Sequence, residues 1–425
     1  MNSKQTQSPV SKPPTLARII LVGLIGNVME WYDFAVYGYF ATVIGHLFFP
    51  ATDPAVSLIA SFGAFAAGFL MRPIGGLVFG RIGDKVGRQR AMLLSVMAMA
   101  IPTVLMSLLP TYETAGIAAP VALVCLRIIQ GLSVGGEFTS SLIFLAEQAP
   151  PGRRSLTAIW GNWGAVLGIL LGSGIGWLVT VWLTEAQIQA WGWRLPFAVG
   201  GLVALVGWSI RHGLHVDLPP MRSESPVKEI FTRYRGQVLR VALLNVGTGV
   251  AFYTVFIYAV SYIRNIDRLP ESLALELNTI SMAALLVLLP LVAWLSDRFG
   301  SRVILILAQV LLASLAYPLF QLIHSAQPVL ILMAELSFAV LVAMGTGGIL
   351  VLNASLIPAP VRCTGLGFAY NIAMGLFGGT TPLIAAWLIN ATGNPVAPAY
   401  WLLTAALVSL LTLVFAVPKC HATGI

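Results

Sequence analysis

The stretch from Arg18 to Tyr39 reads RIILVGLIGNVMEWYDFAVYGY. It is as long as a helix must be to cross the hydrocarbon core of a bilayer, about 20 mostly apolar residues. Glu30 and Asp33 interrupt it, and a charge at that depth is costly unless it faces a cavity or a partner. A cleaved signal peptide would not tolerate these acids. The stretch therefore predicts a retained membrane-spanning helix with one polar face.

Apolar runs of this length recur from Arg18 almost to the C-terminus. Of the 425 residues, 58% are hydrophobic and only 9% are charged, which is far outside the composition of soluble domains. We identify twelve such runs. The sequence therefore predicts an all-α membrane protein with twelve transmembrane helices.

The basic residues give the topology. If the N-terminus is cytoplasmic and each run crosses once, all but five of the 24 Lys and Arg fall in cytoplasmic segments, as the positive-inside rule requires. The exceptions are Arg194, Arg264 and Arg268 near the outer face, and Arg72 and Arg127 inside apolar runs. The net charge of +8 thus orients the chain, with both termini cytoplasmic, and does not indicate nucleic-acid binding.

The two halves of the chain repeat each other. Asp84-Lys85-Val86-Gly87-Arg88 follows the second run, and Asp297-Arg298-Phe299-Gly300-Ser301-Arg302 follows the eighth. Arg153 stands nine residues before Asn162, as Arg362 does before Asn371. Both pairs are about 210 residues apart, which indicates a duplicated six-helix unit. Many secondary transporters have such repeats, with the substrate site near the membrane midplane between them.

This repeat predicts the domain boundaries. The longest polar stretch between runs lies after the sixth and contains several prolines and cations, as a linker would. The predicted parts are a cytoplasmic tail (1–17), a six-helix bundle (18–212), a cytoplasmic linker (213–240), a second six-helix bundle (241–417) and a cytoplasmic tail (418–425).

Polar residues of the first run share one helical face. Asn27, Glu30, Asp33 and Tyr37 are spaced three, three and four apart, which aligns them, and we expect this face to form a polar cavity wall. Arg72 lies at similar depth in the second run, where it can pair with Glu30 or Asp33. Such a pair is either a proton site whose pKa is set by burial and by the arginine, or a static link between two helices.

The fourth run carries Arg127, Gln130 and Glu137 inside the membrane. Arg127 suits a substrate carboxylate, because a guanidinium binds carboxylates through two parallel hydrogen bonds. The alternative is that Arg127 pairs permanently with Glu137 or with an acid of the first run.

Three weaker signals lie elsewhere. Glu335, about seven residues into the tenth run, either lines the cavity or reaches the outer interface. Tyr253 belongs to an aromatic group in the seventh run that either stacks on a ligand or packs in the core. Glycines at four-residue steps in the fifth run predict close helix packing; they are Gly164, Gly168, Gly172 and Gly176.

The sequence contains no motif that indicates an enzyme or a metal site. The three cysteines have no metal-ligand or disulfide spacing, the five histidines do not cluster, and no phosphate-binding loop or nucleophile motif is present. We therefore expect a non-enzyme without a cofactor or metal, with the proton as coupling ion.

The chain resembles the major facilitator superfamily. Gly80-Arg81-Ile82-Gly83-Asp84-Lys85-Val86-Gly87-Arg88 is similar to that family's signature loop between helices 2 and 3. The chain is further similar to the metabolite:proton symporters, through Gly26 to Phe34, Arg72-Pro73-Ile74-Gly75-Gly76, Arg127 to Glu137 and Trp191 to Phe197. The resemblance covers nearly the whole chain.

The resemblance implies two bundles that rock about a central cavity lined by helices 1, 4, 7 and 10. It also implies a cytoplasmic latch in the outward-open state. We assign this gating motif to Gly83, Asp84, Gly87 and Arg88, with Asp297, Arg298 and Gly300 in the half-copy.

The resemblance further implies proton-coupled import of a small carboxylate-bearing metabolite across the inner membrane, by a protein we expect to be a monomer. Relatives in this family carry 2-oxoglutarate, citrate, proline or betaine. Two buried cations, Arg72 and Arg127, favour an organic acid such as 2-oxoglutarate or citrate. The alternative substrate is a zwitterion, proline or glycine betaine; an efflux antiporter and a non-transporting receptor are less favoured.

Overall fold

The computed structural model describes residues 15–52, 54–212 and 224–417, which are helical with no strand. Eleven helices in this part are long and apolar enough to cross a membrane, and the bent pair Glu185–Gly192 and Arg194–Arg211 makes a twelfth span if it crosses as one unit. The twelve-helix prediction is therefore confirmed. The orientation of the termini stays a prediction.

The first bundle contains six spans and four short helical segments. The spans are α1 (Leu16–Tyr39), α3 (Pro54–Lys85), α4 (Arg88–Leu108), α6 (Ala118–Glu147), α7 (Arg154–Trp182) and α9 (Arg194–His212), which begins after the bend. The short segments are α2 (Ala41–Phe48), α5 (Tyr112–Ala115), α8 (Glu185–Gln187) and the π-helix η1 (Ile188–Gly192).

The second bundle is more interrupted. It begins with α10 (Pro226–Thr232), α11 (Arg235–Tyr253), η2 (Thr254–Tyr258), α12 (Ala259–Asn265), α13 (Glu271–Phe299) and α14 (Ser301–Ile323). It continues with α15 (Pro328–Gly347), α16 (Ile349–Leu356), η3 (Ala359–Val361), α17 (Arg362–Ile372), η4 (Ala373–Gly378), α18 (Thr381–Thr392), α19 (Pro398–Leu411) and η5 (Thr412–Ala416). Here η2, η4 and η5 are π-helical turns.

Helices occupy part of the predicted 213–240 linker. Residues 213–223 lie outside the described residues, as do the predicted tails except for residues 15–17. Within the rest, α10 is a short helix and α11 begins at Arg235, six residues before the predicted start of the second bundle. The exposed side chain of Arg235 can reach water from the first turn of a membrane-spanning helix, so the basic residues here do not end the helix.

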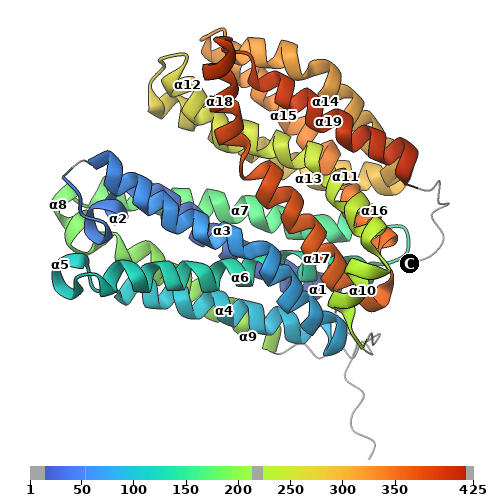
Figure 1. Cartoon of the computed structure of the whole chain (residues 1–425), viewed down its shortest axis with the longest axis horizontal. Helices are drawn as coiled ribbons and strands as arrows, with labels where there is room; N and C mark the ends of the chain where they lie inside the picture. Colours follow the sequence, from blue (N-terminus) through green and yellow to red (C-terminus); the bar gives the residue numbers. More distant parts are fainter. Residues whose placement is uncertain (1–14, 53, 213–223, 418–425) are drawn as a thin grey trace, which may run out of the picture.

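Figure 1 shows the two bundles side by side, α1 to α9 below and α11 to α19 above. They meet at the end that holds α10, α16 and the start of α17, and they spread apart toward the end that holds α2, α5, α8, α12 and α18. Helix α17 packs on α3, and α13 packs on α7. The bundles therefore contact each other at one end, which we call the latch end, and their helices diverge toward the other, which we call the open end.

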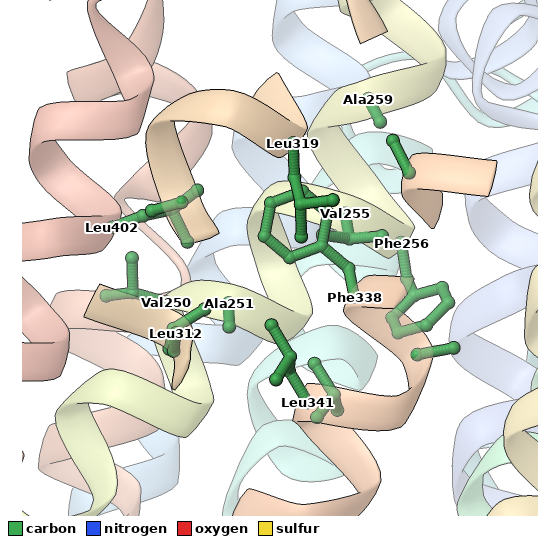
Figure 2. Close-up of a cluster of buried hydrophobic side chains, with 14 of the residues drawn as sticks. Val250, Ala251, Val255, Phe256, Ala259, Leu312, Leu319, Phe338, Leu341 and Leu402 are labelled. Carbon is green, nitrogen blue, oxygen red and sulfur yellow. The ribbon is translucent and has the colours of Figure 1, made fainter. Parts of the chain in front are cut away.

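One apolar core lies mostly in the second bundle, with Ile159 and Val166 of α7 packed into it, and another core contains residues of both bundles. The core of the second bundle joins α11, η2, α14, α15 and α19, and Figure 2 shows Phe256, Leu312, Leu319, Phe338 and Leu402 within it. Burial of this kind holds helices of one bundle together through close van der Waals contact, because lipid tails are as apolar as the side chains.

The repeated loops have the same backbone. Gly87 ends the loop after α3 with φ of 116°, and Gly300 ends the loop after α13 with φ of 94°. Glycine adopts such positive φ values without steric penalty, so the chain can reverse tightly between α3 and α4 and between α13 and α14. The two copies of the sequence motif thus form equivalent turns at the latch end.

The glycine stripe of α7 allows close helix packing, as the sequence predicts, and the helix that packs against it is α1. A Cβ on Gly168 would lie 2.4 Å from the carbonyl oxygen of Val28, and one on Gly172 would lie 2.7 Å from that of Tyr32. These glycines let the backbones approach closely. Gly174 lies on another face of the same helix, where a Cβ would have no atom within 4 Å.

We expect Gly168→Ala to destabilise the protein by about 1–3 kcal/mol, because the new methyl group must push α1 away from α7. The measurement is the fraction of detergent-solubilised protein that stays monodisperse after heating. Gly174→Ala is the matched control and should behave as wild type. Equal melting of the two variants would contradict the assigned packing.

Candidate functional site

A cavity of about 70 Å³ lies between the two bundles, near the middle of the membrane-spanning helices. Its wall is largely aromatic and aliphatic. The aromatic side chains come from four spans and are Trp31, Phe138, Phe252, Tyr253 and Tyr370. The polar side chains are Arg72, Asn162, Asn245, Thr248 and Thr346, and no acidic residue lines the cavity in the described part of the chain.

Arg72 of α3 is the charged group of this wall. Its side chain is buried, and Nε donates to Oδ1 of Asn371 on α17 over 3.1 Å. The guanidinium lies 5.8 Å from the ring centroid of Trp31 and 5.2 Å from that of Phe69. Nη1 has no hydrogen bond of normal geometry to the described residues. The arginine thus bridges the bundles and keeps one donor group for a ligand.

Two further polar groups lie beside this guanidinium. The hydroxyl of Tyr253 is buried next to it and has no other partner in the described part of the chain. Glu30 of α1 is 1% exposed and interacts electrostatically with Arg72. Neither oxygen of Glu30 accepts a hydrogen bond from a described residue. The predicted contact ion pair between Arg72 and an acid of α1 is therefore absent, since Arg72 bonds to Asn371 instead.

The polar face of α1 points into the first bundle and does not form the cavity wall that the spacing predicts. The amide of Asn27 donates to Ser141 of α6 over 2.8 Å, and the hydroxyl of Tyr37 donates to the carbonyl of Ser61 on α3 over 3.0 Å. The cavity is lined instead by Trp31, one residue after Glu30. Other helices of the first bundle pack around α1, so most polar groups of this face bond to neighbours within that bundle.

Asp33 and Arg127 form a buried ion pair inside the first bundle. Nη1 of Arg127 lies 2.8 Å from Oδ2 of Asp33, and both side chains are fully buried. Thr103 donates to the other carboxylate oxygen over 3.0 Å, and Gln130 donates to Thr103 over 3.0 Å. The Tyr37 ring lies 3.8 Å from the guanidinium carbon. Of the two sequence alternatives, the structure contains the one in which Arg127 pairs with an acid of α1.

Glu137 has a partner that the sequence does not indicate. It pairs with Arg211 of α9 and accepts a hydrogen bond from Ser95 of α4. Arg211 also donates to the carbonyls of Val22 and Met92, each over 3.0 Å. Its place at the end of the sixth run puts Arg211 among the predicted cytoplasmic cations. It is 1% exposed, because the packing of α9 directs its side chain into the bundle.

The remaining predicted residues fall in different places. Asn162, Tyr253 and Asn371 are candidate binding residues by sequence; Asn162 and Tyr253 line the cavity, and Asn371 holds Arg72. Glu335 lies between α13 and α15, where it accepts a hydrogen bond from Ser281, and it is not among the residues that line the cavity. Asn245, Thr248, Thr346 and Tyr370 were not predicted; among them only Tyr370 adjoins a predicted site residue in the sequence, Asn371.

The latch end is held by two equivalent carboxylates. Asp84, at the end of α3, accepts hydrogen bonds from the backbone N–H groups of Cys363 and Thr364 over 3.0 and 2.9 Å. Asp297, at the end of α13, accepts from the N–H groups of Ser155 and Leu156 over 2.8 and 2.9 Å. Each aspartate therefore caps the first turn of a helix in the opposite bundle, where the helix dipole favours negative charge.

A salt-bridge network lies next to the first of these caps. Glu147 of α6 is 3.0 Å from Nε of Arg88 and 3.1 Å from Nη1 of Arg362, so it joins cations from both bundles. Gly83 makes room for the Cys363 side chain, since its Cβ would lie 3.1 Å from Sγ. Arg298, which the sequence assigns to the gating motif, makes no such contact between the described residues of the two bundles. It is exposed, and its guanidinium lies over Trp294 and Phe299 of its own helix.

We expect Asp84→Asn to loosen the latch, because the charge-assisted hydrogen bonds to the start of α17 are lost, a change of about 1.5–3 kcal/mol. Cys363 reports on this opening. It is buried and donates its N–H to Asp84, so its rate of modification by a maleimide in a Cys125→Ser, Cys420→Ser background should rise about tenfold or more.

Asp297→Asn should raise the same rate, since it weakens the equivalent cap on α7. Glu113→Gln, far from the latch on α5, is the control. Unchanged labelling of Cys363 in both aspartate variants would show that these caps do not hold the bundles together.

Comparison with known proteins places the chain in a family. The model of the sugar (and other) transporter family matches residues 19–214 and 218–423. The proline/betaine transporter of Escherichia coli K12 is 36% identical over 413 residues, which cover 93% of this chain and 82% of the transporter. The citrate-proton symporter of Klebsiella pneumoniae is 33% identical over 392 residues, covering 91% and 88%.

The fold is similar to those of solved transporters. The major facilitator superfamily proton:xylose symporter XylE, bound to 6-bromo-6-deoxy-D-glucose, superposes with a TM-score of 0.78 and 17% identity over 95% of this chain and 96% of that chain. The transporter FucP in its outward conformation, also of that superfamily, gives a TM-score of 0.67 at 14% identity, over 95% and 99%.

Proposed function

Because this chain belongs to the sugar (and other) transporter family of the major facilitator superfamily, we propose that it imports a small zwitterion, such as proline or glycine betaine, by proton symport. The observation that carries the proposal is the wall of the central cavity. The described residues of this wall offer one guanidinium, several aromatic faces and no carboxylate. Transport follows alternating access, with the substrate bound between the two bundles.

The cavity matches the two ends of a zwitterion. A substrate carboxylate binds Nη1 of Arg72 and the hydroxyl of Tyr253, two groups without other partners among the described residues. A quaternary or secondary ammonium group then faces the rings of Trp31, Phe138 and Phe252, because aromatic faces attract such cations without forming hydrogen bonds. Relatives that are proline/betaine transporters support this assignment.

An organic acid is the second candidate, because one relative is a citrate-proton symporter. The sequence favours this substrate through two free cations, Arg72 and Arg127. The structure removes one of them, since Arg127 is neutralised by Asp33. A di- or tricarboxylate would face a single arginine with Glu30 nearby, so its second charge would be buried without a partner.

Proton coupling centres on Glu30 and Arg72. Glu30 is buried without a hydrogen bond from the described residues, so its ionised form depends on the nearby guanidinium for stabilisation. A proton on Glu30 removes the negative charge that would repel the substrate carboxylate from Arg72, and a bound carboxylate in turn favours the protonated form of Glu30. Proton and substrate therefore bind together, and the reoriented protein releases both.

The charge distribution orients the protein in the membrane. The latch end contains most of the basic residues and is the cytoplasmic end by the positive-inside rule, so the open end faces outward across the cytoplasmic membrane. In this conformation the substrate enters from outside, and breaking the Asp84 and Asp297 caps opens the other side. The alternatives to import are export and binding without transport, and vesicle experiments would distinguish them.

The first test is uptake of labelled glycine betaine and proline into proteoliposomes with an inside-alkaline gradient. Citrate and 2-oxoglutarate serve as competitors. Concentrative, protonophore-sensitive uptake that the other zwitterion inhibits supports the proposal. Uptake inhibited only by citrate or 2-oxoglutarate would assign the organic acid instead.

We expect Glu30→Gln to abolish accumulation driven by the pH gradient but to retain substrate exchange, because Gln holds the neutral state and leaves Arg72 free. The measurement compares gradient-driven uptake with counterflow in vesicles preloaded with substrate. Glu113→Gln is the matched control on the exposed α5. Gradient-driven uptake at the wild-type level by Glu30→Gln would remove Glu30 as the proton site.

We expect Phe252→Leu to raise the KM for glycine betaine roughly 3- to 30-fold, the loss of one cation–π contact of about 0.5–2 kcal/mol. Leucine keeps an apolar wall, so the effect should be much smaller for a substrate without an ammonium group. Leu285→Met, which also lines the cavity, is the control. Similar KM changes in both variants would contradict an aromatic ammonium site.

A further inference from the structure

Glu335 of α15 is another buried acid, which lies in the opposite bundle from Glu30 and is not used by the transport mechanism above. It is 0% exposed. No arginine, lysine or histidine of the described residues interacts with it electrostatically, and its one hydrogen-bond donor there is Ser281 of α13, 3.0 Å from Oε2. Oε1 has no partner in the described part of the chain. An ionised carboxylate in this environment would be an uncompensated buried charge.

The neighbouring polar atoms are acceptors rather than cations. Asn278, one turn from Ser281 on α13, is 9% exposed, and its Oδ1 also lacks a partner among the described residues. Ser281 can direct its hydroxyl to Glu335 or to the carbonyl of Asn278, which lies 2.9 Å away. The cluster therefore has unpaired oxygens and lacks a proton or cation to satisfy them.

Other titratable groups in the outer half of the second bundle do not fill this role. His324 pairs with Asp267 at 2.8 Å, and Glu276 of α13 is exposed. The others on the surrounding elements are Tyr258 of η2, Tyr262 and Arg264 of α12, Arg268 after α12, and Tyr317 of α14.

The cluster adjoins the transport cavity. Glu335 stands seven residues before Val342 on α15, about 10 Å along the helix, and Ser281 stands four residues before Leu285 on α13. Val342 and Leu285 line the cavity, and these spacings keep each pair on one helical face. The cluster thus lies above the cavity, toward the open end of the protein.

The cluster is also bonded to the seventh span. The amide of Asn278 donates to the carbonyl of Phe256 over 3.2 Å. Phe256 lies in the π-helical turn η2, directly after the cavity residues Phe252 and Tyr253, and it packs in the same core as Phe338 of α15 (Figure 2). π-Helical turns often mark places where a helix can shift. Through Ser281 and Asn278, a change of charge at Glu335 therefore acts on the π-helical turn that follows the cavity residues Phe252 and Tyr253.

We propose that Glu335, with Ser281 and Asn278, is a second proton-binding site, so that each transport cycle carries two protons. A proton on the carboxyl of Glu335 removes the uncompensated charge, while Ser281 still donates its hydrogen bond to Oε2. A hard metal cation is normally held by about six oxygens, more than these three side chains supply. The proposal rests on the proposed proton symport.

The site can be tested without transport. Infrared difference spectra of purified protein in lipid nanodiscs, recorded across pH in H₂O and D₂O, should contain a protonated-carboxyl band that Glu335→Gln removes. Glu276→Gln, an exposed acid on α13, should leave that band unchanged. The band should also shift in Ser281→Ala, which keeps the carboxyl but loses its hydrogen bond. The same spectra in Glu335→Gln and wild type would overturn the proposal.

The stoichiometry is measured from the substrate gradient that nulls the transport current at 100 mV without a pH gradient. For a neutral zwitterion, one proton per cycle corresponds to a gradient of about 50-fold and two protons to about 2,400-fold. We expect the two-proton gradient for wild type and the one-proton gradient for Glu335→Gln. Glu335→Asp should restore the two-proton gradient if the carboxyl group is required and the exact length of its side chain is not.

Failure of the proposed symport and failure of the second proton site give different experimental results. No substrate uptake by the wild type refutes the proposed function, whereas the infrared titration still decides whether Glu335 binds a proton. Normal uptake with an unchanged null gradient in a well-folded Glu335→Gln protein refutes the second proton and leaves the symport proposal intact. A null gradient that depends on the sodium concentration at fixed pH would also refute it.

Discussion

The cost of a charge inside the membrane governs how this protein is built. Each ionised side chain at that depth must find a partner, because neither lipid nor water is there to stabilise it. The first bundle meets this requirement with two closed pairs, Asp33 with Arg127 and Glu137 with Arg211. These pairs tie α1, α4, α6 and α9 together. Among the described charges buried at mid-membrane, Arg72, Glu30 and, in the second bundle, Glu335 remain outside them.

The groups without full pairing carry the proposed chemistry. A closed ion pair exchanges a proton or a ligand only after it is broken, whereas Arg72 already presents a free nitrogen to the cavity. Its bond to Asn371 of α17 also makes it a contact between bundles. Substrate that binds Arg72 therefore acts on the same interface that must rearrange for the cavity to change its access.

Duplication explains the latch but not the binding site. The two aspartates, Asp84 and Asp297, occupy equivalent turns and cap helices of opposite bundles, so the closed end has near two-fold symmetry. The cavity does not share it. The charged wall residue comes from α3, whereas the repeat places the apolar Leu285 at the corresponding position of α13. The second bundle supplies aromatic surface and helices broken by π-turns, which suits a wall that changes shape.

The sequence by itself determined the number and type of the spans, the internal repeat, the close packing of the glycine stripe of α7 and the absence of enzyme motifs. These follow from hydropathy, spacing and small residues, which are local properties of the chain. It also identified the buried charges. Only the tertiary structure decided their partners: Arg127 belongs to Asp33, Glu137 to Arg211, and the polar face of α1 points away from the cavity. Periodicity tells which residues share a helical face, but the direction of that face depends on the neighbouring helices. With the partners unknown, the number of free cations was overestimated, and so was the case for an organic acid.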